Sequence, residues 1–167
     1  MTHSELINLL IKVLLILSLG YLSYIDWRSF RLPNLFTLPL ISIGVIFSSI
    51  PGLGFTNTPS ALMGVVFGYG FLWALNAGYK AIKGKNGIGM GDAKLLAALG
   101  AWLGWTALPS ILLIASILGL IGGLTWLKWH GHKHDQAFPF GPFLAIAGII
   151  ELLWPQLIQT LLLPNLT

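Results

Sequence analysis

Two aspartates stand at the ends of apolar stretches in a chain that holds only five acidic residues. Asp92 closes the run Gly89-Met90-Gly91-Asp92 at the start of one apolar stretch, and Asp26 lies at the end of another. Two carboxylates a few ångströms apart in a poorly solvated site do not both ionise readily, so they share one proton and titrate as a pair. The ionised member can draw a proton from a water that attacks a carbonyl group, while the protonated member stabilises the developing oxyanion. This chemistry requires no metal, cofactor or nucleophilic side chain.

The composition identifies the chain as a membrane protein. Hydrophobic residues make up 56% of its 167 residues and charged residues 8%, against roughly 25% charged in a soluble domain. The length fits one domain, residues 1–167, because no linker, low-complexity tract or repeat divides it. The lack of cysteine excludes a disulfide, a thiol nucleophile and a cysteine-based zinc site. The net charge of +4 comes from bases beside apolar stretches, which indicates membrane anchoring and not a nucleic-acid partner.

Six apolar segments, each long enough to cross or nearly cross a bilayer, predict an all-α, polytopic membrane helix bundle with about six transmembrane helices. Their approximate ranges are 6–25, 34–50, 60–82, 92–108, 109–128 and 140–161. The second and fourth are short, since roughly 17 residues at 1.5 Å each extend only about 26 Å across a core near 30 Å. No Lys or Arg precedes the first segment as in a basic n-region, and it has no small-residue cleavage site, so we expect a retained span and not a removed signal peptide.

The basic residues predict how the chain crosses the membrane. Lys and Arg concentrate in cytoplasmic connections, and here they fall in or beside the first, third and fifth connections: Arg28, Arg31, Lys80, Lys83, Lys85, Lys94, Lys128 and Lys133. The second and fourth connections carry no charge. We therefore expect Asp26 and Asp92 at one cytoplasmic face, with both termini outside. Lys12 is the exception, and its long stem would reach toward the outer headgroups.

Small and aromatic residues predict how the helices pack. Gly64 with Gly68, and Gly100 with Gly104, form two GxxxG pairs that let helices approach closely. The two glycines of Gly89-Met90-Gly91-Asp92 are expected to allow backbone conformations closed to other residues and the close approach of a neighbouring chain. Five tryptophans fit the interfacial belts of a membrane protein: Trp102, Trp105, Trp126, Trp129 and Trp154.

Taken together, Asp26, Gly89-Met90-Gly91-Asp92 and Pro139-Phe140-Gly141-Pro142 resemble the type IV prepilin peptidases, which are membrane aspartic proteases of the GxGD class. The resemblance covers nearly the whole chain and implies that Asp26 and Asp92 are the catalytic pair. It also implies a set of residues that bind substrate or shape the loops: Pro33, Asn34, Gly89, Gly91, Lys94, Pro139, Gly141 and Pro142.

Members of that family remove the short basic leader of prepilins and pseudopilins at the cytoplasmic face of the bacterial inner membrane. The resemblance therefore implies an aspartic endopeptidase without a cofactor, whose partners are a prepilin or pseudopilin and the lipid bilayer. It assigns no oligomeric state. Larger members also carry a cysteine-containing zinc domain and methylate the new amino terminus. This chain has no cysteine, and its first connection has about eight residues, a usual length between helices, so methyltransferase activity is not expected.

Simpler, non-catalytic interpretations of the same residues stay open. Asp92 alone is typical of a helix cap, because an acid at a helix start accepts hydrogen bonds from exposed N–H groups. Asp26 alone is equally typical of a solvated acid at the membrane interface. Lys94 is more simply a headgroup anchor than a catalytic partner, since positions 92 and 94 do not face each other on a helix.

Other functions would also use rare acids and histidines. A GxGD intramembrane protease for other substrates, similar to presenilin, needs both aspartates, but the Tyr-Asp and Pro-Ala-Leu motifs of presenilin are not found. A small proton-coupled transporter would keep membrane carboxylates, although the chain shows no pair of similar halves. A catalytically silent homologue would keep only the fold. His130, His132 and His134 could hold a divalent metal, but solvated spacers in a loop explain them more simply.

Overall fold

All six predicted segments are helices in the computed structural model, which describes residues 3–29, 32–85, 87, 89–130 and 139–155. The elements are α1 (His3–Ser29), α2 (Asn34–Ser48), α3 (Thr58–Lys83), α4 (Met90–Leu103), the short 3₁₀ helix η1 (Trp105–Ala107), α5 (Leu108–His130) and α6 (Gly141–Leu153). No strand occurs within these described ranges. The prediction of an all-α bundle is therefore confirmed.

Three of the helices are long and apolar enough to cross a membrane. The spans are Glu5–Ser29, Thr58–Lys83 and Trp105–Thr125, with 25, 26 and 21 residues. The helices α2 and α4 are short, as predicted, with 15 and 14 residues. Helix α6 has 13 residues and ends at Leu153, so it is shorter than the predicted segment 140–161, whose last residues lie outside the described chain. Length and composition together show a membrane protein.

The close packing predicted from small residues joins α3 to α4. A Cβ atom at Gly64 would overlap the backbone of Gly100, and one at Gly68 would lie 2.8 Å from the carbonyl oxygen of Leu96. Overpacking of this kind costs about 1–3 kcal/mol, so glycine is needed where these helices cross. Gly104 has a different role from the one predicted, because its φ of +85° ends α4 and turns the chain into η1.

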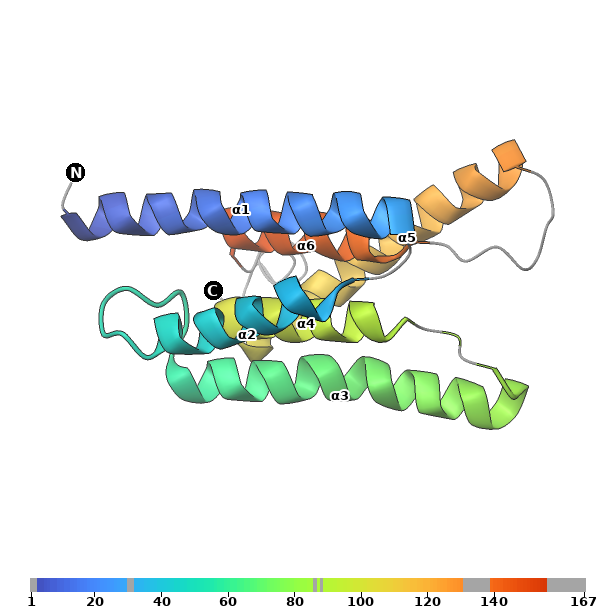
Figure 1. Ribbon diagram of the computed structural model, residues 1–167, viewed down its shortest axis with the longest axis horizontal. Coiled ribbons are helices and arrows are strands. Elements are labelled where there is room, and N and C mark those ends of the chain that lie inside the picture. Colours follow the sequence, from blue (N-terminus) through green and yellow to red (C-terminus); the bar gives the residue numbers. More distant parts are fainter. Residues whose placement is uncertain (1–2, 30–31, 86, 88, 131–138, 156–167) are drawn as a thin grey trace, which may run out of the picture.

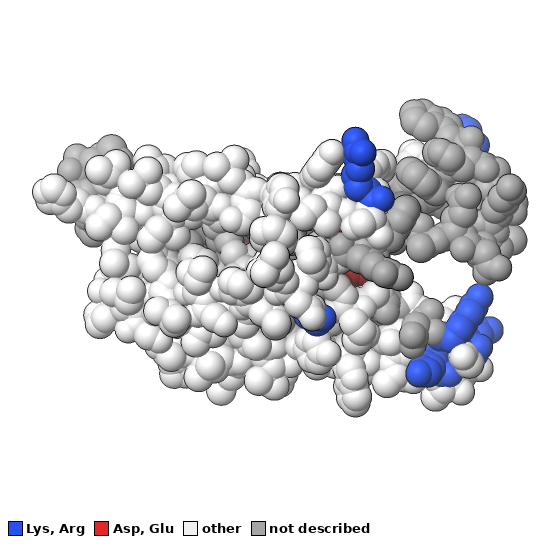
Figure 2. Space-filling model, viewed as in Figure 1, with Lys and Arg blue, Asp and Glu red and all other residues white. Residues whose placement is uncertain are grey.

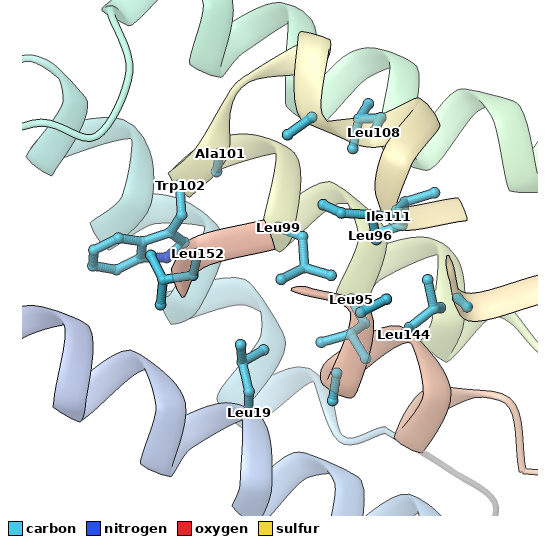
Figure 3. Close-up of a cluster of buried hydrophobic side chains, with 14 of the residues drawn as sticks. Leu19, Leu95, Leu96, Leu99, Ala101, Trp102, Leu108, Ile111, Leu144 and Leu152 are labelled. Carbon is cyan, nitrogen blue, oxygen red and sulfur yellow. The ribbon is translucent and has the colours of Figure 1, made fainter. Parts of the chain in front are cut away.

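Helix α4 is the central element of the bundle. Ten of its 14 residues are buried, and a helix that is apolar all round belongs in the interior. It packs against α3, α2 and α6, while α1 packs on α6 (Figure 1). Figure 3 shows the resulting core, in which Leu95, Leu96 and Leu99 meet side chains from other helices, such as Leu19 and Leu144.

Trp102 is a core residue, so its assignment to an interfacial belt is wrong. Its side chain is 5% exposed, and its Nε1–H donates to the carbonyl oxygen of Leu40 at 2.9 Å. The indole also lies against Phe47, with ring centroids 5.4 Å apart. Trp105 and Trp154 fit the prediction, being 44% and 60% exposed. The side chains of Trp126 and Trp129 lie outside the described set.

One end of the bundle collects the helix ends that carry the candidate site. Helix α1 ends there, and α2, α4 and α6 begin there (Figure 1). On the face shown in Figure 2, the visible Lys and Arg side chains lie in the half of the molecule nearer that end, and acidic atoms show only in small recessed areas. The fold therefore brings Asp26, Asp92 and Gly141 to one end of the protein from three separate helices.

Candidate active site

Asp26 lies in the last turn of α1 and is buried, with 5% of its surface exposed. Its Oδ2 atom accepts a hydrogen bond from the backbone N–H of Gly141, the first residue of α6, at 3.1 Å. The first N–H groups of a helix have no partner within the helix, and the helix dipole places partial positive charge there. The start of α6 is therefore a natural partner for a carboxylate, and it holds Asp26 in place.

Gly141 is required by the closeness of this contact. A Cβ atom built on Gly141 would lie 2.6 Å from Oδ2 and 2.9 Å from Cγ of Asp26, so no side chain fits between them. Pro142 follows in the first turn of α6, where a missing N–H removes no helical hydrogen bond. Pro139 and Pro142 are both buried. The structure thus brings the predicted Pro139-to-Pro142 motif directly to Asp26.

Asp92 is the third residue of α4 and is 9% exposed. Its backbone N–H donates to the carbonyl oxygen of Gly89 at 3.1 Å. Gly89 is the N-cap residue of this helix, and no side chain caps it. Asp92 is therefore not the N-cap, although its place in the first turn lets the helix dipole favour a negative charge.

The two carboxylates lie at the same end of the bundle. Asp26 and Asp92 are the buried aspartates of the described chain, and the charge of Asp26 acts on Asp92. A low-dielectric interior strengthens the interaction of two such charges compared with water. An arrangement of this kind favours a form with one shared proton, which offers an acid and a base at the same place.

The glycines beside Asp92 differ from the prediction in one respect. Gly91 is part of α4, and Gly89 has φ −68° and ψ 131°, a conformation open to any residue. Neither has a positive φ, so the expected need for an unusual backbone conformation is wrong. The expected close approach is confirmed at Gly91, whose Cβ would lie 3.0 Å from Cβ of Leu32. A Cβ at Gly89 would meet Oδ2 of Asp92 at an ordinary 3.4 Å.

Lys94 connects the starts of two helices. Its ammonium group donates to Oδ1 of Asn34, the first residue of α2. Pro33 is the N-cap of α2, and its carbonyl oxygen accepts from the backbone N–H of Thr37 at 3.3 Å. Lys94 therefore has a partner within the protein, which the headgroup-anchor interpretation did not include. The contact sets the start of α4, which carries Asp92, against the start of α2.

The sequence pattern of the type IV leader peptidase family matches residues 13–124. This range covers most of the chain and includes both Asp26 and Asp92. The chain belongs to the type IV leader peptidase family. The resemblance found in the motifs is thereby confirmed.

Curated relatives agree with this membership. The chain is 44% identical to a prepilin leader peptidase/N-methyltransferase of Aeromonas hydrophila over 144 residues, which cover 86% of this chain and 49% of that protein. A protein of the same name from Pseudomonas aeruginosa is 45% identical over 143 residues, 84% of this chain and 49% of the relative. The chain thus spans about half the length of the curated relatives it matches. No solved structure matches it.

Asn76 and Tyr79, which no motif of the sequence pointed to, shape the loop that leads to Asp92 in this member of the leader peptidase family. Asn76 of α3 is 8% exposed, and its Oδ1 accepts from the backbone N–H of Gly87 at 2.9 Å. A Cβ at Gly87 would lie 2.5 Å from the ring of Tyr79, so the loop runs directly over that ring. A lone asparagine inside an apolar span is a signal that could have found Asn76, because buried polar groups need partners.

A metal site is not seen in the part of the chain that the structure describes. No group of three or more His, Cys, Asp or Glu side chains gathers there. The side chains of His130, His132 and His134 lie outside the described residues, so the alternative of a histidine metal site stays a prediction. Among the described residues, Asp26 and Asp92 supply the carboxyl groups of the candidate site.

Proposed function

We propose that this chain is an aspartic endopeptidase that removes the leader peptide of type IV prepilins or pseudopilins, with residues 1–167 acting as one peptidase domain. One observation carries the proposal: Asp26 and Asp92, from α1 and α4, are buried at one end of the bundle, where the charge of Asp26 acts on Asp92. The names of the curated relatives support the choice of substrate.

The proposed reaction uses the pair as acid and base. The ionised carboxylate takes a proton from water, and the oxygen of that water forms a bond to the carbonyl carbon of the leader's last peptide bond. The protonated carboxylate gives its proton to the carbonyl oxygen. When the tetrahedral intermediate collapses, a proton passes to the leaving nitrogen and the C–N bond breaks. No side chain forms a covalent bond to the substrate, and the protons are exchanged by the two carboxyl groups.

Gly141 has a positioning role in this scheme. Its N–H donates to Oδ2 of Asp26, so the other carboxylate oxygen, Oδ1, is left for proton exchange with water or with Asp92. Holding a reacting group in one orientation removes an entropic cost from the reaction. Lys94 and Asn34 act indirectly, because their hydrogen bond sets the start of α4 against the start of α2.

Leader removal by the purified protein tests the proposal. A synthetic prepilin segment with its basic leader and apolar helix should be cut once, with both products identified by mass spectrometry. A strong chelator should leave the rate within a few fold, because the acid pair needs only water. Replacement of His130, His132 and His134 by alanine should have equally little effect. Activity that is lost on chelation and restored by one metal would contradict the two-aspartate mechanism.

The proposed reaction also requires the pair to face the cytoplasm of a bacterial inner membrane. Lys85 and Pro51 are exposed in connections at opposite ends of the bundle, and the protein has no cysteine of its own. A Lys85→Cys variant should react with an impermeant thiol reagent only after the cytoplasmic side is opened. A Pro51→Cys variant should react in intact cells after the outer membrane alone is permeabilised. The reverse pattern would place Asp26 and Asp92 on the wrong side for prepilin processing.

A further inference from the structure

A cavity of about 260 Å³ lies at the end of the bundle opposite to Asp26 and Asp92, and two opposite charges line it. Lys12 comes from α1, and Glu151 comes from the last turn of α6. Thr56, in the connection between α2 and α3, and Thr106 of η1 add hydroxyl groups to the wall. Charged side chains are costly within a membrane protein, so two at one cavity indicate a function.

Lys12 was expected to reach toward the outer headgroups. Its side chain turns toward this cavity and does not simply run along the outer surface. Its Nζ atom lies 5.7 Å from the centre of the Phe55 ring, another part of the cavity wall. A cation over an aromatic face gains electrostatic stabilisation, which helps to hold the ammonium group here. Glu151 is 4% exposed and therefore lies deeper than Lys12. The cavity thus has an anionic inner wall and a cation nearer its rim.

The turn after α4 builds one side of the cavity. Gly104 has a φ of +85°, which favours glycine. A Cβ atom there would lie 2.6 Å from Oγ1 of Thr56 and 2.5 Å from Oγ of Ser60. The backbone of this turn therefore lies directly against Thr56 and carries Thr106 just beyond it. The fold thus places both threonines in the wall of the cavity.

Two tryptophans mark the depth of the cavity in the membrane. Trp105 precedes Thr106, and Trp154 precedes Pro155, which also lines the cavity. Both indoles are exposed, Trp105 at 44% and Trp154 at 60%. Exposed tryptophans of membrane proteins gather at the level of the lipid headgroups. The cavity therefore lies where phospholipid headgroups are present.

We propose that this cavity binds the headgroup of phosphatidylethanolamine. The Lys12 ammonium and the hydroxyl groups of Thr56 and Thr106 bind the phosphate, and Glu151 accepts hydrogen bonds from the ammonium of the lipid. One cation and one anion in the wall match the two charges of this headgroup. Phosphatidylcholine has a trimethylated ammonium without N–H donors, and phosphatidylglycerol has no cation for Glu151. The site therefore selects a zwitterionic lipid with a primary ammonium.

Native mass spectrometry of the purified full chain tests this assignment. The protein in detergent is titrated separately with short-chain phosphatidylethanolamine, phosphatidylcholine and phosphatidylglycerol, and bound lipid is counted. We expect about tenfold tighter binding of phosphatidylethanolamine, because charge-assisted hydrogen bonds are the strong ones. Lys12→Gln should weaken its binding about tenfold, and Lys12→Arg should retain it. Glu151→Gln should remove the preference over phosphatidylcholine.

Lys80→Gln is the matched control, because Lys80 is an exposed base at the other end of the bundle, and it should leave binding unchanged. Equal binding of the three lipids by the native protein would overturn the assignment, whether or not any variant folds. A preference for phosphatidylglycerol would also overturn it, since Glu151 would then repel the preferred headgroup. The outcome does not depend on peptidase activity, so this proposal and the proposed function can fail separately.

Discussion

Asp26→Asn and Asp92→Asn should each abolish detectable leader removal from a prepilin while the protein remains folded in the membrane. Each change removes either the acid or the base of the pair, and such groups typically contribute about 10² to 10⁴ in rate. Asparagine keeps the size of the side chain, so packing around both buried positions is retained. The measurement is the initial rate of leader release by purified protein, with helix content checked by circular dichroism.

Glu5→Gln is the matched control for this pair of variants. Glu5 is exposed in the first turn of α1, far along that helix from Asp26, so its neutralisation should leave the rate unchanged. The native protein should lose activity at both acidic and alkaline pH, because the working form holds one shared proton. If either single aspartate variant still processed prepilin at the native rate, this would contradict the two-aspartate mechanism. The transporter or silent-homologue interpretation would then be better.

Gly141→Ala should lower leader removal by about 10²-fold, the loss expected when a reacting group is displaced by about 1 Å. The added methyl carbon would lie 2.6 Å from Oδ2 of Asp26, so either the carboxylate or the start of α6 must move. The variant removes no titratable group, so its effect would come from position alone. We expect the loss in kcat, with KM for the prepilin segment changed by no more than a few fold.

Gly20→Ala is the control, since a Cβ at Gly20 of α1 meets no other atom within 4 Å. It should cleave at the native rate and unfold at the native temperature. Native activity in Gly141→Ala would show that the contact between α6 and Asp26 has no part in the reaction. A large fall in its unfolding temperature together with loss of helix would instead indicate a purely structural role and contradict the prediction.

The sequence by itself determined the class of the protein and the apolar segments that become helices, and it singled out the residues that we propose carry the chemistry. These follow from local properties: apolar runs of sufficient length predict spans, and glycine or proline at their ends predicts where they stop. The distribution of Lys and Arg was enough to predict that Asp26 and Asp92 share one membrane face. Asp26, Gly89-Met90-Gly91-Asp92 and Pro139-Phe140-Gly141-Pro142 together were enough to predict the family, which the comparison with known sequences confirmed.

Only the tertiary structure decided which residues meet. The hydrogen bonds from Gly141 to Asp26 and from Lys94 to Asn34 join residues far apart in the chain. Trp102 is of a residue type that gathers in interfacial belts. It becomes a core residue because its Nε1–H can donate to the carbonyl oxygen of Leu40 in α2. An apolar helix in a membrane protein can bury any of its faces, since its periodicity says little about which face meets lipid and which meets protein. The choice depends on close contacts such as Gly64 against Gly100, and these exist only once the helices have packed.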